Sequence, residues 1–142
     1  MPSIRKPHPR SPYEKLGGYV QLPRLIDKAR LHRQGLLNGY NYKTVGFDKH
    51  LLAFLKLNGD AFEEAANRLT SDDEMLKWVE QHGSKHSWQE IEEWNQAMIA
   101  RHPDTAEKSA RFLHFLEEAG GKGRTDIRTY FDLIEFDEGR LK

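Results

Sequence analysis

Proline placement constrains the fold of this chain more than any other feature of its 142-residue sequence. Five of the six prolines fall within the first 23 residues, and the sixth is Pro103. Because proline breaks helix interiors, we expect residues 1–22 to form an extended arm that packs on the rest of the protein. Residues 23–142 are free to form a single compact all-α domain of six or seven short helices.

Capping residues and apolar spacing locate these helices. Two capping boxes begin at Ser71 and Ser87, while Asp48 and Thr125 are expected N-caps. Apolar residues recur at i, i+3 and i+4 between these signals, as in amphipathic helices. Residues 40–45 are the one stretch with strand-like content, either a short strand or an aromatic loop. The expected helices cover residues 23–34, 48–57, 60–69, 71–83, 87–101, 103–119 and 125–138.

Charge and cysteine content exclude several classes of protein. The chain has 22 Lys and Arg, 22 Asp and Glu and no cysteine. A balanced charge argues against a general nucleic-acid binder, and the missing cysteines exclude disulfides, thiolate nucleophiles and cysteine-ligated zinc. No apolar stretch is long enough to span a membrane, and no targeting segment is visible, so we expect a soluble, cytoplasmic protein.

The charges are nevertheless unevenly distributed. Residues 1–35 carry eight Lys and Arg against two acids, a net charge of +6, and the remainder carries −6. A basic arm can bind a polyanion, or it can lie against the acidic body of its own chain. The basic residues are spread along the arm and the first helix instead of forming a block, which favours the second interpretation.

Few residues suggest chemistry, and we expect neither a metal nor a cofactor. The sequence has no metalloprotease, nucleophile-elbow or Walker A motif. Asn95 lies in the middle of an apolar helical stripe, where it either joins a structural hydrogen-bond network or faces a pocket. His32 shares a helix face with Leu22 and Leu25, which predicts a buried histidine with a structural role.

The remaining candidates are charged residues near the two ends of the helical region. Because buried polar groups must find partners, we predict that Arg24 or Lys28 lies near Asp137 or Glu138, with Asn95 bordering the same region. A structural network is favoured over a ligand pocket. The predicted cluster comprises Arg24, Asp27, Lys28, His32, Trp94, Asn95, Asp137, Glu138 and Arg140.

The last helix carries apolar residues on two sides. Ile127, Tyr130 and Ile134 belong to one stripe, and Phe136 lies nearly opposite. A helix that is apolar all round is central or lies at an interface, so this pattern predicts a homodimer through the last helix.

Short motifs along nearly the whole chain resemble a small bacterial family catalogued only as a domain of unknown function. They are Ser11-Pro12, Leu16-Gly17-Gly18, Leu22-Pro23-Arg24, Asp27-Lys28, Gly46-Phe47-Asp48, Trp94-Asn95, Phe131-Asp132-Leu133-Ile134 and Asp137-Glu138-Gly139-Arg140. The resemblance implies a single bacterial domain, and it adds no activity, cofactor or catalytic residue.

Three functions are consistent with the sequence. The favoured one is a non-catalytic binding or accessory module that recognises a protein partner or a small polar ligand, because the sequence contains no recognisable catalytic constellation. The second is a small enzyme that combines His32 or Asn95 with Asp137 or Glu138. The third is an anion or nucleic-acid binder that uses the basic arm.

Overall fold

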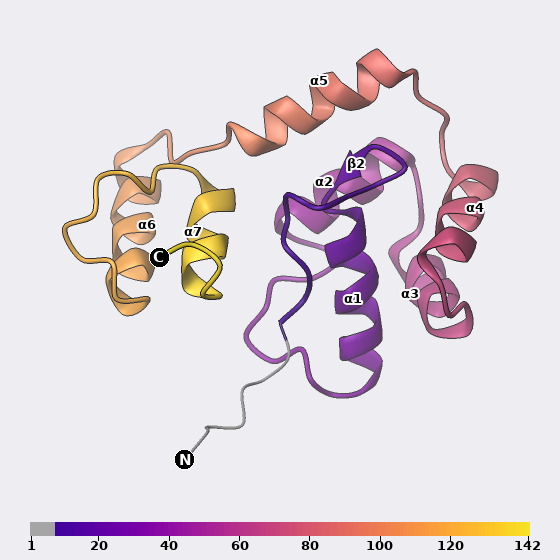
Figure 1. Ribbon diagram of the computed structural model, residues 1–142, viewed down its shortest axis with the longest axis horizontal. Helices are drawn as coiled ribbons and strands as arrows, with labels where there is room; N and C mark the ends of the chain where they lie inside the picture. Colours follow the sequence, from indigo (N-terminus) through magenta and orange to yellow (C-terminus); the bar gives the residue numbers. More distant parts are fainter. Residues whose placement is uncertain (1–7) are drawn as a thin grey trace. The chain divides into compact units, whose positions relative to one another are not determined.

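The computed structural model describes residues 8–142, so the first seven residues of the predicted arm lie outside the described part. Between His8 and Lys142 the chain forms seven helices and one small sheet (Figure 1), which confirms the predicted α class. The helices are α1 (Leu22–Arg33), α2 (Gly46–Leu55), α3 (Gly59–Arg68), α4 (Asp72–His82), α5 (Trp88–Ile99), α6 (Ala106–Glu118) and α7 (Tyr130–Asp137).

The sheet is a short antiparallel pair of β1 (Lys15–Leu16) and β2 (Tyr19–Val20) within the predicted arm. Gly17 and Gly18 join the strands with φ angles of +59° and +88°. This left-handed backbone is accessible to glycine without the steric cost of a Cβ, which explains the tight turn. Residues 40–45, for which the sequence left a short strand or an aromatic loop open, form a loop.

The chain divides into two compact units, Met1–Glu92 and Glu93–Lys142, and the boundary falls inside α5. In the first unit, α1 packs against α3 and β1, and α3 also packs against α4. Side chains that are fully excluded from solvent form its interior: Val20, Leu22, Leu25, Ile26, Leu51, Leu55, Phe62 and Met75.

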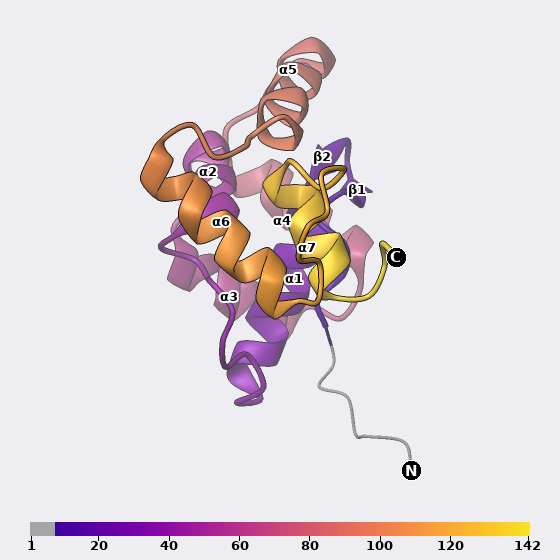
Figure 2. The ribbon, with the colours of Figure 1, turned by 90° about the vertical axis from the view of Figure 1, so that its left-hand side faces the viewer.

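In the second unit, α6 and α7 lie side by side, as Figures 1 and 2 both show. Their core contains Phe112, Leu116 and Ile127, and Phe136 packs against it. Gly121 follows α6, and a Cβ atom there would lie 2.6 Å from Leu116 Cδ1 and 2.8 Å from Phe136 Cε2. A larger residue at this position would therefore force Leu116 or Phe136 to shift.

The caps test the predicted helix starts. Glu74 N donates to Ser71 Oγ and Glu90 N donates to Ser87 Oγ, both at 3.1 Å, so the two capping boxes are confirmed. The N-cap prediction for Thr125 is wrong, because α7 begins later and Thr129 caps it. The prediction for Asp48 is also wrong, because Asp48 lies within the first turn of α2, where its carboxylate has buried tertiary partners.

Candidate functional site

A buried ion pair lies in the interior of the first unit. Lys28 Nζ is 3.1 Å from Asp48 Oδ2, and the two side chains are 7% and 0% exposed. Asp48 Oδ1 accepts a hydrogen bond from Gln21 Nε2 at 2.8 Å. A charge is tolerated in a protein interior only when it is paired and hydrogen-bonded in this way.

The same ion pair also holds the loop between α1 and α2. Lys28 Nζ donates to Asn41 O at 2.8 Å, and Lys43 N donates to Asp48 Oδ2 at 3.3 Å. Buried pairs of this kind add little net stability compared with apolar packing, but removing one partner is costly. The pair therefore fixes the position of residues 41–43 relative to α1 and α2.

Arginines attach the described part of the arm to helices of the first unit. Arg24 is 3% exposed and donates to Arg10 O at 3.1 Å. Arg10 in turn binds Asp27 on α1 through Nε at 3.0 Å, and Asp72 at the start of α4 through Nη1 at 2.6 Å. The hydrogen bond from Arg10 holds the pKa of Asp72 below its ordinary value, against the opposing effect of burial. The arm is thus held to two helices by paired charges.

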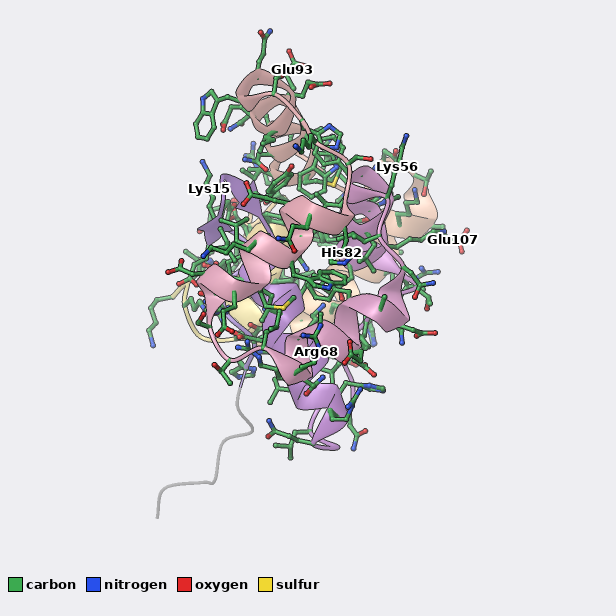
Figure 3. All side chains as sticks on the ribbon, turned by 90° about the vertical axis from the view of Figure 1, so that its right-hand side faces the viewer. Lys15, Lys56, Arg68, His82, Glu93 and Glu107 are labelled. Atoms are coloured by element: carbon green, nitrogen blue, oxygen red, sulfur yellow. The ribbon has the colours of Figure 1, made fainter. Side chains whose placement is uncertain are left out.

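A surface groove of about 400 Å³ lies beside the loop that the buried pair holds. The end of α2 and the start of α3 supply most of its walls, and Lys56 lies where α2 ends (Figure 3). The groove is lined by Lys43, Thr44, Lys49, Leu52, Ala53, Lys56, Leu57, Asn58, Gly59 and Asp60. Three of these residues are lysines and one is an acid, so the groove is positively charged.

Lys43 has an unusual backbone and a close neighbour. Its φ is +62°, a left-handed conformation that β-carbon-bearing residues seldom adopt. A Cβ on Gly59 would lie 2.5 Å from Lys43 Cγ, so the glycine leaves room for the lysine stem. Lys43 Nζ then reaches Asp60 Oδ1 at 2.6 Å, and this hydrogen bond lowers the pKa of Asp60.

The other two groove lysines carry uncompensated charge. Within residues 8–142, neither Lys49 nor Lys56 lies within ion-pair distance of a carboxylate, and both are exposed. Lys56 also has a left-handed backbone, with a φ of +54°. Their ammonium groups are therefore available to an anion from solution.

His32 was predicted to be buried, and this prediction is wrong. Its side chain is 51% exposed, and Nδ1 is 2.6 Å from Glu63 Oε1 on α3. The Tyr42 hydroxyl donates to the same oxygen at 2.7 Å. Burial works to raise the pKa of Glu63, but the hydrogen bonds from Tyr42 and His32 hold it below its ordinary value. The helical wheel failed here because His32 lies at the edge of the apolar stripe, in the last turn of α1.

The candidates of the second unit include one buried amide and a local charge cluster. Asn95 is 0% exposed, as predicted from its place in the apolar stripe, and Trp94 is half-buried. Arg140 Nη1 is 2.7 Å from Glu138 Oε1, whose side chain is 3% exposed, while Asp137 is exposed. The ion pair between Arg140 and Glu138 joins residues that directly follow the C-terminal end of α7.

Two predictions that reach beyond a single unit stay predictions. The first is the pairing of Arg24 or Lys28 with Asp137 or Glu138, which joins residues of both units. The second is the homodimer through α7. Phe136, whose position suggested the dimer, packs against the core of its own unit, so intramolecular packing already accounts for this apolar side chain.

Sequence reasoning missed Asp48 as an interior partner, although a signal for it exists. Asp48, Leu51, Leu52 and Leu55 follow i, i+3, i+4, i+7 spacing, which places the acid on the apolar face of α2. Lys28 likewise lies beside Leu25 on α1. An acid and a base on the apolar faces of two neighbouring helices indicate a buried pair. The groove lysines carry no comparable pattern.

Residues 8–142 lack two other kinds of feature. No group of three or more His, Cys, Asp or Glu side chains is arranged to hold a metal ion. None of the described helices combines the length and the apolar character that crossing a membrane requires.

Comparison with protein families matches residues 6–140 to the family described as "Domain of unknown function (DUF5069)". The chain belongs to this family. The match spans nearly the whole sequence, so the buried ion pair, the groove and most of both units fall inside the DUF5069 domain. The comparison with curated proteins finds no match. Family membership thus supports the predicted resemblance and assigns no activity.

Proposed function

We propose that this DUF5069 protein is a non-catalytic binding module whose ligand is a small anion held in the groove between α2 and α3. The observation that carries the proposal is the set of three lysines, Lys43, Lys49 and Lys56, around one groove of about 400 Å³. Concave sites with a few convergent polar groups are the usual places for small ligands.

The charge balance of the groove gives the first argument. Asp60 neutralises Lys43, to which it is paired at 2.6 Å, and the charges of Lys49 and Lys56 remain. An anion seated between these ammonium groups would gain charge-assisted hydrogen bonds, which are about twice as strong as neutral ones.

The backbone gives the second argument. Lys43 and Lys56 both have positive φ angles, where glycine or asparagine would be less strained. Each such residue costs on the order of 1 kcal/mol, and strain of this kind gathers at functional sites. A lysine at both positions indicates that the side chains contribute more than the backbone loses.

The buried ion pair gives the third argument, because it positions one wall. Lys43 N donates to the carboxylate of Asp48, which Lys28 and Gln21 hold from α1 and its N-cap. A binding site whose wall is fixed in advance loses less conformational entropy when a ligand arrives. The interior of the first unit thereby preorganises the surface site.

The proposal predicts anion binding that depends on the groove lysines. Titration of the full chain with sodium pyrophosphate at constant ionic strength, followed by amide chemical shifts, should perturb residues 43–60. Replacing both free lysines, Lys49→Gln with Lys56→Gln, should weaken binding about tenfold, because two charge-assisted contacts are lost.

A matched control separates a site from general attraction to positive charge. Lys77→Gln with Lys85→Gln removes two exposed lysines of the same unit that do not line the groove. This control should bind pyrophosphate as the unmodified protein does. Equal weakening by both double variants would show that binding depends on the net charge of the protein and not on the groove. That result would contradict the proposal.

A further inference from the structure

The groove has room for an organic ligand. Its volume is about 400 Å³, within the range of roughly 300–1,000 Å³ that is usual for small-molecule sites. An inorganic ion would leave most of this space to water. A ligand that uses the whole groove needs a body in addition to its charged group.

The walls show what kind of body would fit. Leu52, Ala53 and Leu57, from α2 and the residues that follow it, form an apolar side of the groove, while the ammonium groups of Lys49 and Lys56 supply positive charge. Lysine stems are themselves apolar up to the ammonium group and can cover a hydrophobic ligand surface. The groove thus combines an apolar patch with cationic groups.

The cations favour a phosphate over a carboxylate. Three lysines and one aspartate give the lining a net charge of +2, and a phosphate monoester carries about −1.5 to −2 at pH 7. The groove contains no arginine, so an anion there would meet the point charges of lysines, which are common phosphate-binding groups.

From these observations we infer that the ligand is an organic phosphate monoester, with its phosphate between Lys49 and Lys56 and its apolar body against Leu52, Ala53 and Leu57. This inference rests on the proposed anion-binding function and narrows it to one ligand class. It predicts that an ester with an apolar body binds more tightly than inorganic phosphate, because the body removes apolar surface from water.

Three probes test this inference on the full chain at pH 7.5 and constant ionic strength. Phenyl phosphate carries both features, inorganic phosphate lacks the body, and benzoate replaces the phosphate by a carboxylate. We expect phenyl phosphate to bind about tenfold more tightly than either of the others. Chemical shifts of the amides of residues 43–60 report the binding.

Two variants test which groove residues contact the apolar body of the ligand and which contact its phosphate. Ala53→Gln fills the apolar side without changing any charge, and because Ala53 is exposed the fold should be unaffected. It should bring phenyl phosphate down to the affinity of inorganic phosphate. Ala110→Gln, at an exposed position of α6, is the matched control and should change neither affinity. Lys49→Gln with Lys56→Gln should weaken both phosphates.

The outcomes separate this inference from the proposed function. If phenyl phosphate and inorganic phosphate bind equally, or if benzoate binds as tightly as phenyl phosphate, the phosphate-ester class is wrong and anion binding stands. If no probe binds, or if the Lys49→Gln, Lys56→Gln double variant binds as tightly as the unmodified protein, the inference and the proposed function are both wrong. Circular dichroism melting of each variant confirms that the compared proteins are folded.

Discussion

The two units of this protein use their interiors differently. The first unit encloses Arg24, Lys28 and Asp48, which are 3%, 5% and 0% exposed, and each of them has a hydrogen-bond partner from another segment. The core cluster of the second unit is apolar, built on Phe112 and Leu116. Apolar packing stabilises without direction, whereas a hydrogen-bonded charge requires each partner at a defined position. The first unit therefore uses its interior to position a surface loop.

Among the variants that test this difference between the units, replacing the buried acid Asp48 should have the largest effect on stability. Asp48→Ala leaves the ammonium group of Lys28 buried without its carboxylate, which should cost about 4 kcal/mol of unfolding free energy. Guanidinium denaturation followed by circular dichroism measures the loss. A cost below about 1 kcal/mol would show that water reaches Lys28 and that the pair is not an interior one.

The matched control replaces both charges together. Lys28→Met with Asp48→Leu leaves no unpaired ion, so it should cost less than Asp48→Ala alone. It should also release residues 41–43, because their hydrogen bonds to Lys28 and Asp48 are lost. Faster amide hydrogen exchange at Lys43, at nearly unchanged global stability, would separate positioning from stabilisation.

A substitution in the core of the second unit should cause an intermediate loss of stability. Leu116→Ala removes a side chain that is 2% exposed, which should cost about 3 kcal/mol through lost burial and the cavity that remains. Leu113→Ala on the same helix is the control, because Leu113 is 59% exposed and should change stability by less than about 0.5 kcal/mol. Similar costs for both variants would mean that Leu113 is covered in solution.

A substitution in the arm should cause the smallest loss of stability. Arg10→Ala should cost about 1 kcal/mol, because its pairs with Asp27 and Asp72 are partly exposed and screened by solvent. The hydrogen bond from Arg10 lowers the pKa of Asp72 in the folded chain. Its contribution is therefore present above the unfolded pKa and is lost as pH falls through the folded pKa.

The stability difference between the unmodified protein and Arg10→Ala should consequently shrink between about pH 5 and about pH 2. Urea denaturation at several pH values measures this trend. Asp104→Ala should show the same trend with a smaller amplitude, because the hydrogen bond from Lys108 also lowers the pKa of Asp104 but both partners are exposed. A difference that stays constant as the acids protonate would exclude the arm pairs as its source.

These predictions rest on features that the sequence revealed unequally. Local signals sufficed for helices: the capping boxes at Ser71 and Ser87 formed as expected because each involves residues three apart. The N-cap assignment failed at Asp48 because a partner twenty residues away, Lys28, outweighed the local preference of aspartate for helix ends. Spacing places Asp48 on the apolar face of α2, but it does not identify the distant residue with which Asp48 pairs.

The same difference between local signals and tertiary contacts explains which residues of the candidate site the sequence predicted. Lys28 was selected as a charge in need of a partner, and it has one in the interior of the first unit. Lys43, Lys49 and Lys56 were not selected, because surface lysines on a loop and a helix are common. Their meeting depends on the left-handed backbone at Lys43 and Lys56 and on the room left by Gly59. Neither feature follows from periodicity.

The ion pair between Lys28 and Asp48 also limits how this sequence can change over time. A single substitution at either position leaves an unpaired charge in the interior, and its cost of about 3–5 kcal/mol is a large part of the roughly 5–15 kcal/mol by which natural domains are stable. A change of both residues at once could be tolerated, but two simultaneous substitutions are rare. The lineage of this protein is therefore confined near its present pair, even though an apolar pair could serve the fold as well.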